Sequence, residues 1–220
     1  MFSESDRKEI RERLKGLTNP VKLIHFTQEL DCEFCPVTRR LLEQLVELSD
    51  KLSLEVYNFQ LDKEKVAQYH IDKVPATVLE GAKDYGIRFY GIPHGYEFAT
   101  LLDSVLAVSQ GESGLSRATV ERLRNLEQPV HLQVFVTPTC PYCPAAVRLA
   151  HQFAIESDLV TADIVEATEF PDLVQRYGVR GVPFTVVNEE ASIVGALPED
   201  AFVQEMLRLL HEKRTTPARV

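Results

Sequence analysis

The apolar positions of this chain repeat one order of elements twice. In each half, a helical pattern stops before Pro20 or Pro129, and a short apolar run typical of a buried strand follows. The chain then passes through a Cys-x-x-Cys pair into a second helical pattern, and three strands and two helices complete the half. This order predicts a mixed sheet with helices on both faces, which is an α/β fold.

Residue ranges follow from the same pattern. Helices are distinguished by apolar residues three or four positions apart, whereas the strands are short apolar runs. The strands are expected at 21–26, 54–59, 77–79 and 87–90 in the first half and at 132–136, 160–166, 184–187 and 192–194 in the second. The opening helices are expected around 10–17 and 120–126, and the closing helices over 96–108 and 199–211.

The two halves are copies of one unit. A set of residues recurs 108 positions later without a gap, and it includes both cysteines and a Val-Pro pair in each half. Upstream of the cysteines the offset becomes 109, so the first half carries one extra residue just before them. A polar segment with two glycines, at 110–114, is the natural linker. We therefore predict a tandem duplication, with one domain over 1–110 and a second over 111–220.

Composition and charge bound the class of protein. The 220 residues suffice for two domains, and 45% hydrophobic with 26% charged residues is ordinary for a globular chain. A formal net charge of −9 argues against binding to nucleic acid or to anionic membrane surfaces. The N-terminus is charged where a secretory signal needs an apolar core, and no apolar run approaches the length of a membrane span. We expect a cytoplasmic protein whose partners are neither nucleic acid nor membrane.

All four cysteines lie in the two Cys-x-x-Cys pairs. Structural disulfides are unusual in the cytoplasm, so this placement indicates thiols that cycle between reduced and oxidised forms. Each pair falls at the start of a predicted helix, where free backbone N–H groups and the helix dipole stabilise the attacking thiolate. We expect Cys32 and Cys140 to be nucleophiles and Cys35 and Cys143 to resolve the mixed disulfide. Redox-active disulfides are then the redox centres, and no other cofactor is expected.

The residues between the cysteines differ in the two pairs. Glu33 puts a carboxylate beside Cys32, which disfavours the Cys32 thiolate by like-charge repulsion. Pro141 and Tyr142 carry no charge at the corresponding positions. The sequence therefore predicts that Cys140 has the lower pKa and reacts faster with substrate.

A Val-Pro pair follows the second cysteine of each half by the same number of residues. These pairs are Val74-Pro75 and Val182-Pro183. A proline is ordinarily preceded by a trans bond, but the fixed spacing favours a cis-proline that faces the cysteines. Such a bond would free the backbone of the preceding valine to pair with an extended substrate segment, as in strand addition. We therefore expect both pairs to bind substrate.

Three ionisable residues are weaker candidates for moving protons beneath the cysteines. His25 lies where such a group would sit below the first pair, although a histidine in an apolar strand is more often a core residue. Glu166 and its counterpart Asn58 end equivalent strands and could face the cysteines. A buried acid there could accept the proton of a resolving cysteine, although a polar residue at a strand end is more often simply exposed. Asp163 competes with Glu166 for that role.

Two other classes of protein stay open. Two Cys-x-x-Cys pairs can hold zinc, but paired ligands are usually about 15 to 20 residues apart, and a far longer segment separates Cys35 from Cys140. We expect no metal site, and a zinc-stabilised interaction module would be revealed by loss of the fold on chelation. A scaffold for unfolded chains would keep its function after all four cysteines were replaced by serine.

Each half resembles the thioredoxin and glutaredoxin superfamily, and Cys140-Pro141-Tyr142-Cys143 is similar to the glutaredoxin active site. The tandem arrangement resembles the two-domain protein disulfide oxidoreductases of thermophilic archaea and bacteria. This resemblance implies two tandem thioredoxin-fold units, each a four-stranded mixed sheet flanked by helices. It also implies exchange with protein disulfide substrates, in reduction, formation or isomerisation.

The resemblance further implies partners. A thioredoxin-reductase-like flavoprotein would recharge the sites, and a peroxiredoxin is an open alternative as electron acceptor. The N-terminal part of the alkyl hydroperoxide reductase flavoprotein is similar, but there the first site has lost its cysteines and a flavin domain follows. An electron-shuttle module between a flavoprotein reductase and a peroxidase is therefore the alternative function. The Gly-Gly of glutaredoxins is reduced here to Gly195-Ala196, so glutathione use is not implied.

Overall fold

The computed structural model describes residues 2–215, and the expected order of elements is present in both halves. The first half comprises α1 (Glu4–Leu14), β1 (Val21–Thr27), α2 (Cys35–Val46), β2 (Leu52–Asn58), α3 (Lys63–Gln68), β3 (Ala76–Glu80), β4 (Asp84–Tyr90) and α4 (Tyr96–Gln110). The second half comprises α5 (Arg117–Arg124), β5 (Val130–Val136), α6 (Cys143–Glu156), β6 (Val160–Glu166), α7 (Pro171–Tyr177), β7 (Phe184–Val187), β8 (Ala191–Val194) and α8 (Glu199–Thr215).

Local sequence explains where the two helices that carry cysteines begin. The second cysteine of each pair is the first residue of its helix, and a proline follows it, Pro36 in α2 and Pro144 in α6. Proline suits the first turn because its φ is already helical and the N–H group that it lacks would have no partner within the helix. Each Cys-x-x-Cys therefore spans the junction of loop and helix.

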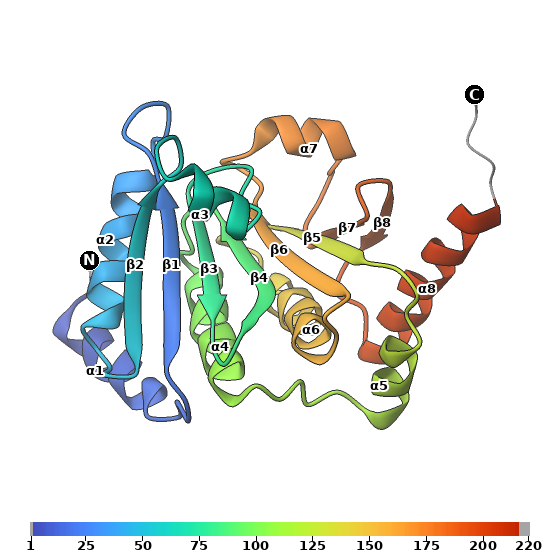
Figure 1. Cartoon of the computed structure of the whole chain (residues 1–220), viewed down its shortest axis with the longest axis horizontal. Helices are drawn as coiled ribbons and strands as arrows, with labels where there is room; N and C mark the ends of the chain where they lie inside the picture. The colour runs from blue at the N-terminus through green and yellow to red at the C-terminus, as the bar shows by residue number, and fades with distance from the viewer. Residues whose placement is uncertain (1, 216–220) are drawn as a thin grey trace.

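All eight strands form one sheet in the order β2-β1-β3-β4-β6-β5-β7-β8 (Figure 1). Within each unit the first two strands are parallel, and the hairpin strands are antiparallel. The units meet where β4 pairs in parallel with β6, from Ile87 opposite Ala162 to Tyr90 opposite Val165. Each unit is thus a four-stranded mixed sheet flanked by helices, and the two sheets are continuous.

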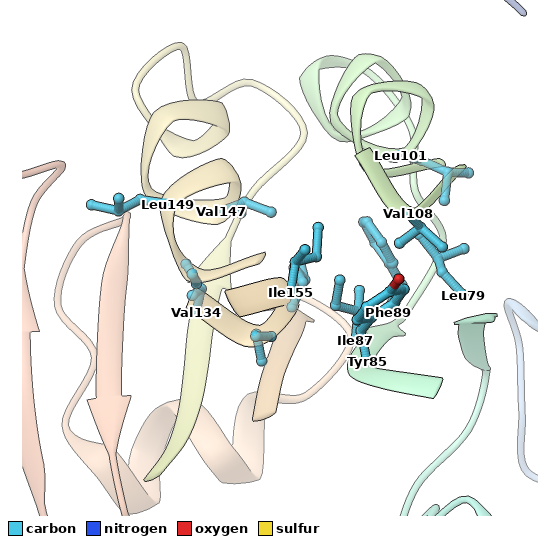
Figure 2. Packing of buried hydrophobic residues seen from close by; sticks show 14 of the residues in the cluster. Leu79, Tyr85, Ile87, Phe89, Leu101, Val108, Val134, Val147, Leu149 and Ile155 are labelled. Carbon is cyan, nitrogen blue, oxygen red and sulfur yellow. The ribbon is translucent and has the colours of Figure 1, made fainter. Parts of the chain in front are cut away.

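The strands bury opposite faces with alternate residues, as the two-residue period of a strand requires. In β1, Leu23 belongs to a large apolar cluster that includes residues of α2, α4 and α6, whereas Ile24 and Phe26 belong to a smaller cluster with Tyr69 on the other face. Side chains of α4 and α6 converge on β4, so the core is also continuous between the units (Figure 2). This shared core fixes the position of one cysteine pair relative to the other.

The observed bounds follow the expected ones closely. The strands β6 and β7 match the expected ranges, β2 begins earlier than expected and ends at Asn58 instead of Phe59, and the other strands and the closing helices extend beyond their ranges by a few residues. The opening helices end earlier than expected, at Leu14 and Arg124. Leu17 is nevertheless buried, in the turn between α1 and β1, because it still packs against the main core.

Candidate functional site

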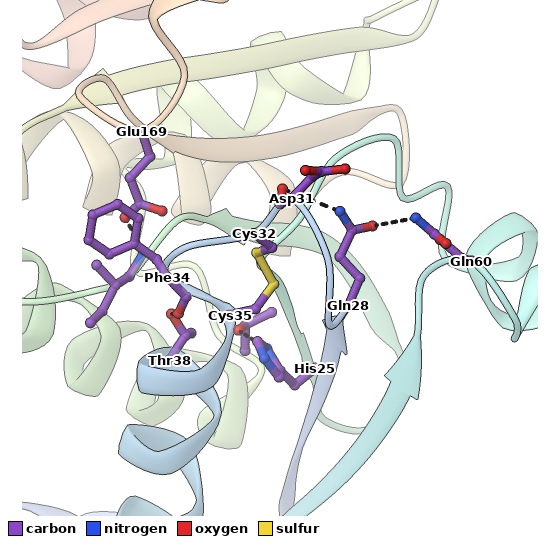
Figure 3. Close-up of a disulfide and its surroundings, with 11 residues drawn as sticks. His25, Gln28, Asp31, Cys32, Phe34, Cys35, Thr38, Gln60 and Glu169 are labelled. Carbon is purple, nitrogen blue, oxygen red and sulfur yellow. Dashed lines mark hydrogen bonds between the residues drawn. A yellow bond between two sulfur atoms is a disulfide. The ribbon is translucent and has the colours of Figure 1, made fainter.

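Both cysteine pairs form disulfides. The first joins Cys32 to Cys35, at the end of the loop that leads from β1 into α2 (Figure 3). Cys32 is half-buried, whereas Cys35 has no exposed surface. The first sulfur is therefore the one that a substrate can reach, and the second lies against the core.

The second pair has the same arrangement, but its first cysteine is more deeply buried. Cys140 is joined to Cys143, with exposed fractions of 7% and 1%. The backbone N–H of Cys143 donates a hydrogen bond to Cys140 Sγ at 3.1 Å. A donor at the start of a helix stabilises a thiolate on that sulfur. This bond favours the lower pKa that the sequence predicts for Cys140, and the Cys140 pKa stays a prediction.

The loops between the cysteines also differ in what they expose. Glu33 is exposed beside Cys32, and Tyr142 leaves 71% of its surface exposed beside Cys140. An aromatic side chain at the rim of a reactive sulfur offers an apolar contact to an approaching polypeptide. The two sites therefore present different surfaces to substrates.

The peptide bonds Val74-Pro75 and Val182-Pro183 are both cis. Each proline directly precedes a hairpin strand, β3 or β7, and its carbonyl accepts the N–H of a glycine, Gly91 for Pro75 and Gly195 for Pro183. Both prolines are buried, and both valines are half-buried. The backbone at Val74 and Val182 thus lies at the end of a strand, and substrate binding there stays a proposal.

Both disulfides lie at the same edge of the sheet. The strands β1 and β5 run in the same direction, because β4 and β6 are parallel and each unit repeats the same topology. Each cysteine pair follows the carboxyl end of one of these strands. Three strands lie between β1 and β5, so the sites are on the order of 20 Å apart at about 4.8 Å a step.

Each active-site loop contacts the other unit. The carbonyl of Pro138, in the loop before Cys140, accepts the N–H of Tyr96 at the start of α4, at 3.0 Å. In the reverse direction, Glu169 follows β6, accepts the N–H of Ile92 at 2.7 Å and lies beside Phe34 of the first site (Figure 3). The join between the units therefore helps to position both sites.

A solved structure of a protein disulfide oxidoreductase from Aeropyrum pernix k1 has the same architecture over nearly the whole chain. It is 35% identical in sequence, its TM-score is 0.89, and the match covers 96% of this chain and 94% of that one. This chain belongs to the protein disulfide oxidoreductase family. A family model described as a thioredoxin domain matches residues 130–208, which lie in the second unit.

This chain is also similar to part of a longer reductase. The N-terminal domain of alkylhydroperoxide reductase AhpF from Enterococcus faecalis is 27% identical, with a TM-score of 0.86 over 94% of this chain and 100% of that one. The corresponding alkyl hydroperoxide reductase of Xanthomonas campestris pv. phaseoli is 25% identical over 76% of this chain and 30% of its own length. The chain therefore spans about a third of the length of the curated relatives it matches.

Three carboxyl groups lie together where the two units meet. Burial first, and then the charges of Glu166 and Glu169, raise the pKa of Glu97 to about 9. Burial likewise raises the pKa of Glu169 to about 7. Each of the three side chains has one buried oxygen without a hydrogen-bond partner. Groups with raised pKa values can hold protons near neutral pH, which proton transfer to and from thiols requires.

Glu97 could not be selected from the sequence, since an acidic residue in the first turn of a helix is ordinary and signals no special role. Only the pairing of β4 with β6 brings Glu97 close to Glu166, which the sequence did select. Glu166 accepts from Thr168 Oγ1 at 2.6 Å and from the N–H of Glu169 at 2.8 Å through one oxygen. Its other oxygen is unpaired and buried.

Two sequence candidates have other partners. Asn58 Oδ1 accepts the N–H groups of Gln60 and Leu61, so this side chain stabilises the turn before α3. Asp163 Oδ2 is 2.7 Å from His131 Nε2, and Asp163 lies on the opposite face of β6 from Glu166 because their positions differ by an odd number. The interpretation of Asp163 as a competitor of Glu166 is therefore wrong.

No candidate metal site is found within residues 2–215, where no three His, Cys, Asp or Glu residues are grouped so as to hold an ion. All four cysteines are in disulfides. None of the helices in the described part of the chain is long and apolar enough to cross a membrane.

Proposed function

We propose that this protein is a thiol-disulfide oxidoreductase that reduces, forms or isomerises protein disulfides at two sites. The observation that carries the proposal is the repeated Cys-x-x-Cys disulfide at a helix start, in which the first sulfur is more accessible than the second. Membership of the protein disulfide oxidoreductase family supports it.

In the reducing direction, the thiolate of Cys32 or Cys140 attacks one sulfur of a substrate disulfide. The substrate S–S bond breaks, a mixed disulfide forms, and one substrate sulfur leaves as a thiolate that takes up a proton. Cys35 or Cys143 then loses its proton and attacks the first cysteine. The site disulfide closes, the second substrate thiol is released, and two electrons have passed to the substrate. The reverse sequence forms a disulfide in the substrate.

The substrate would bind next to the cis prolines. The exposed edge of the chain at Val74 and Val182 would pair with an extended segment of substrate, which positions a substrate sulfur for in-line attack. Backbone pairing recognises no particular side chain, so we infer broad specificity for segments that are already unfolded or extended.

The electron-shuttle alternative has support of its own. The similarity to the N-terminal domain of alkylhydroperoxide reductase AhpF favours a thioredoxin-reductase-like flavoprotein as electron donor and a peroxiredoxin as acceptor. The same thiol chemistry would serve both roles, and the partner would decide between them. A cytoplasmic location, where such reductases keep thiols reduced, remains a prediction.

Insulin reduction and the reactivation of scrambled ribonuclease, each measured with the full chain and with Cys-to-Ser variants of either site, test the proposal. We expect each single-site variant to retain part of the activity and the variant with all four cysteines replaced to lose it. Retention of activity in that last variant would refute the proposal and favour a binding scaffold. Reduction by a flavoprotein reductase, followed with a peroxiredoxin as acceptor, separates the shuttle from the general oxidoreductase.

A further inference from the structure

His25 lies in the core directly under the first disulfide. It is on the face of β1 that Leu23 also occupies, toward α2, and it has no exposed surface. Figure 3 shows its ring beneath Cys35, and both residues are fully buried. A polar ring in this position is close to the thiol that forms when the disulfide is reduced.

The hydrogen bonds of His25 leave one nitrogen free. Nδ1 is 3.2 Å from Oγ1 of Thr77, its partner residue on β3, whereas Nε2 is buried and has no partner. Leaving a buried nitrogen unpaired costs free energy, so a feature of this kind calls for a reason. With the hydrogen on Nδ1, which donates to Thr77, Nε2 keeps a lone pair that can accept a proton.

The second unit provides the comparison within the same chain. There, Val134 stands opposite Thr185 in the pairing of β5 with β7, just as His25 stands opposite Thr77. Thr185 Oγ1 has no hydrogen-bond partner, because valine supplies none. The imidazole is therefore specific to the first site and is not required by the fold of the unit.

We propose that His25 is the base that accepts the proton of Cys35 in the resolving step of the first site, an inference that rests on the proposed function. Nε2 takes the proton from Cys35 Sγ, and the thiolate attacks Cys32 Sγ. The bond between Cys32 and the substrate sulfur breaks as the Cys32–Cys35 bond forms. The departing substrate thiolate then takes up the proton that the imidazolium gives back, so no external oxidant or reductant is needed.

The surroundings keep the imidazole neutral while the disulfide is closed. Burial lowers the pKa of His25 to about 4, opposed by a hydrogen bond with the backbone of Ala76 and assisted by the charge of Arg39. The groups that act on the ring are therefore Arg39 from α2, Ala76 and Thr77 from β3, and Cys35, which lies over the ring in Figure 3. A thiolate on Cys35 would favour the imidazolium, because opposite charges in a buried site stabilise each other.

The test uses the full chain with Cys140 and Cys143 replaced by serine, so that only the first site reacts. The reduced protein is mixed with 5,5′-dithiobis(2-nitrobenzoate) in a stopped-flow instrument. Attack by Cys32 releases one coloured thiolate, and resolution by Cys35 releases a second. We expect His25→Val to slow the second phase about 100-fold or more, the usual contribution of a general base, and to leave the first phase unchanged.

The dependence on pH separates a base from a packing residue. Between about pH 6 and 8 the wild-type second phase should change little, whereas in His25→Val it should rise nearly tenfold per pH unit, since solvent must then deprotonate Cys35. His25→Asn, which keeps a polar group but cannot accept the proton, should behave like His25→Val. The second site, measured with Cys32 and Cys35 replaced by serine, should keep both phases in either variant, which verifies folding.

Second phases with the wild-type rate and pH dependence in both His25 variants would overturn the inference and leave the proposed function intact. Failure of the wild-type protein to show either phase would instead refute the proposed function. If His25→Val misfolds, His25→Asn alone decides the outcome, because its shape is closer to histidine and its rate and pH profile make the same prediction.

Discussion

Replacing Glu97 by glutamine should change the way that the stability of this protein depends on pH. Glu97 is 4% exposed, and one of its oxygens has no partner. Burial, followed by the charges of Glu166 and Glu169, raises its pKa from 4.5 to about 9. Glutamine has nearly the same shape as the protonated acid and cannot ionise. The variant therefore removes one titration and little else.

The size of the effect follows from proton linkage. Above pH 4.5 the unfolded chain releases the Glu97 proton, while the folded protein holds it until about pH 9. The unfolded state then gains about 1.4 kcal/mol for each pH unit, so folding stability falls as pH rises across this window. Between about pH 5.5 and 8 the loss amounts to about 3 kcal/mol. Glu97→Gln should escape this loss and become the more stable protein at pH 8.

Urea unfolding of the oxidised proteins at half-unit steps from pH 5 to 8.5 measures the effect. The difference in unfolding free energy between Glu97→Gln and wild type should grow steadily with pH. The matched control is Glu64→Gln, since Glu64 is an exposed residue in the first turn of α3, and its difference from wild type should be flat. A difference for Glu97→Gln that stays constant within about 0.5 kcal/mol would show that Glu97 is ionised in the folded protein and refute the reasoning.

Three further outcomes are expected. Gly95→Ala should cost at least about 1–3 kcal/mol in denaturant unfolding, because Gly95 has φ +61° and an added Cβ would collide with the carbonyl oxygen of Pro138; Gly181→Ala, where nothing lies within 4 Å, is the control. Burial lowers the pKa of His131, but the hydrogen bonds and charges of Asp163 and Glu189 outweigh burial and raise that pKa to about 9. The charged imidazole therefore stabilises the fold below pH 6.5, and this contribution is lost as the pH rises through 9. The unfolding free energy of the wild type should fall by roughly 2 kcal/mol over this range, and that of His131→Gln should not. The rates of insulin reduction by the two single-site variants should sum to the wild-type rate, because sites about 20 Å apart cannot exchange disulfides directly. A wild-type rate clearly above that sum would show that the two sites do not act independently.

Local features of the sequence predicted the parts of the fold that depend on local chemistry. The period of apolar residues located the strands, and β6 and β7 fall at the expected residues. The helical pattern after each cysteine pair placed the helix starts, and the repeated spacing indicated the cis bonds at Pro75 and Pro183. The strands and helix starts are determined by neighbours in the chain, whereas the cis bonds were predicted from the repeat of the whole unit.

Contacts between the units could not be predicted in this way. The pairing of β4 with β6 joins two strand edges, and edge pairing depends on matching lengths and exposure rather than on a motif. Glu97 acquires its neighbours only through that pairing. Asp163 was misassigned for a different reason, since residues three apart in a strand point to opposite faces, and the two-residue period alone would have separated it from Glu166.

The two units are joined head to tail and not about a two-fold axis, because β4 pairs with β6, which is the counterpart of β2 and not of β4. Repeated between molecules, the same contact would set β8 of one copy against β2 of the next and extend without closing, as head-to-tail contacts do. However, β8 has only 4 residues, so it could pair with an incoming strand over no more than the four residue pairs that join β4 to β6. Such a contact between copies would lack the covalent link that holds the two units of one chain together, and so short a terminal strand therefore favours growth into fibres little.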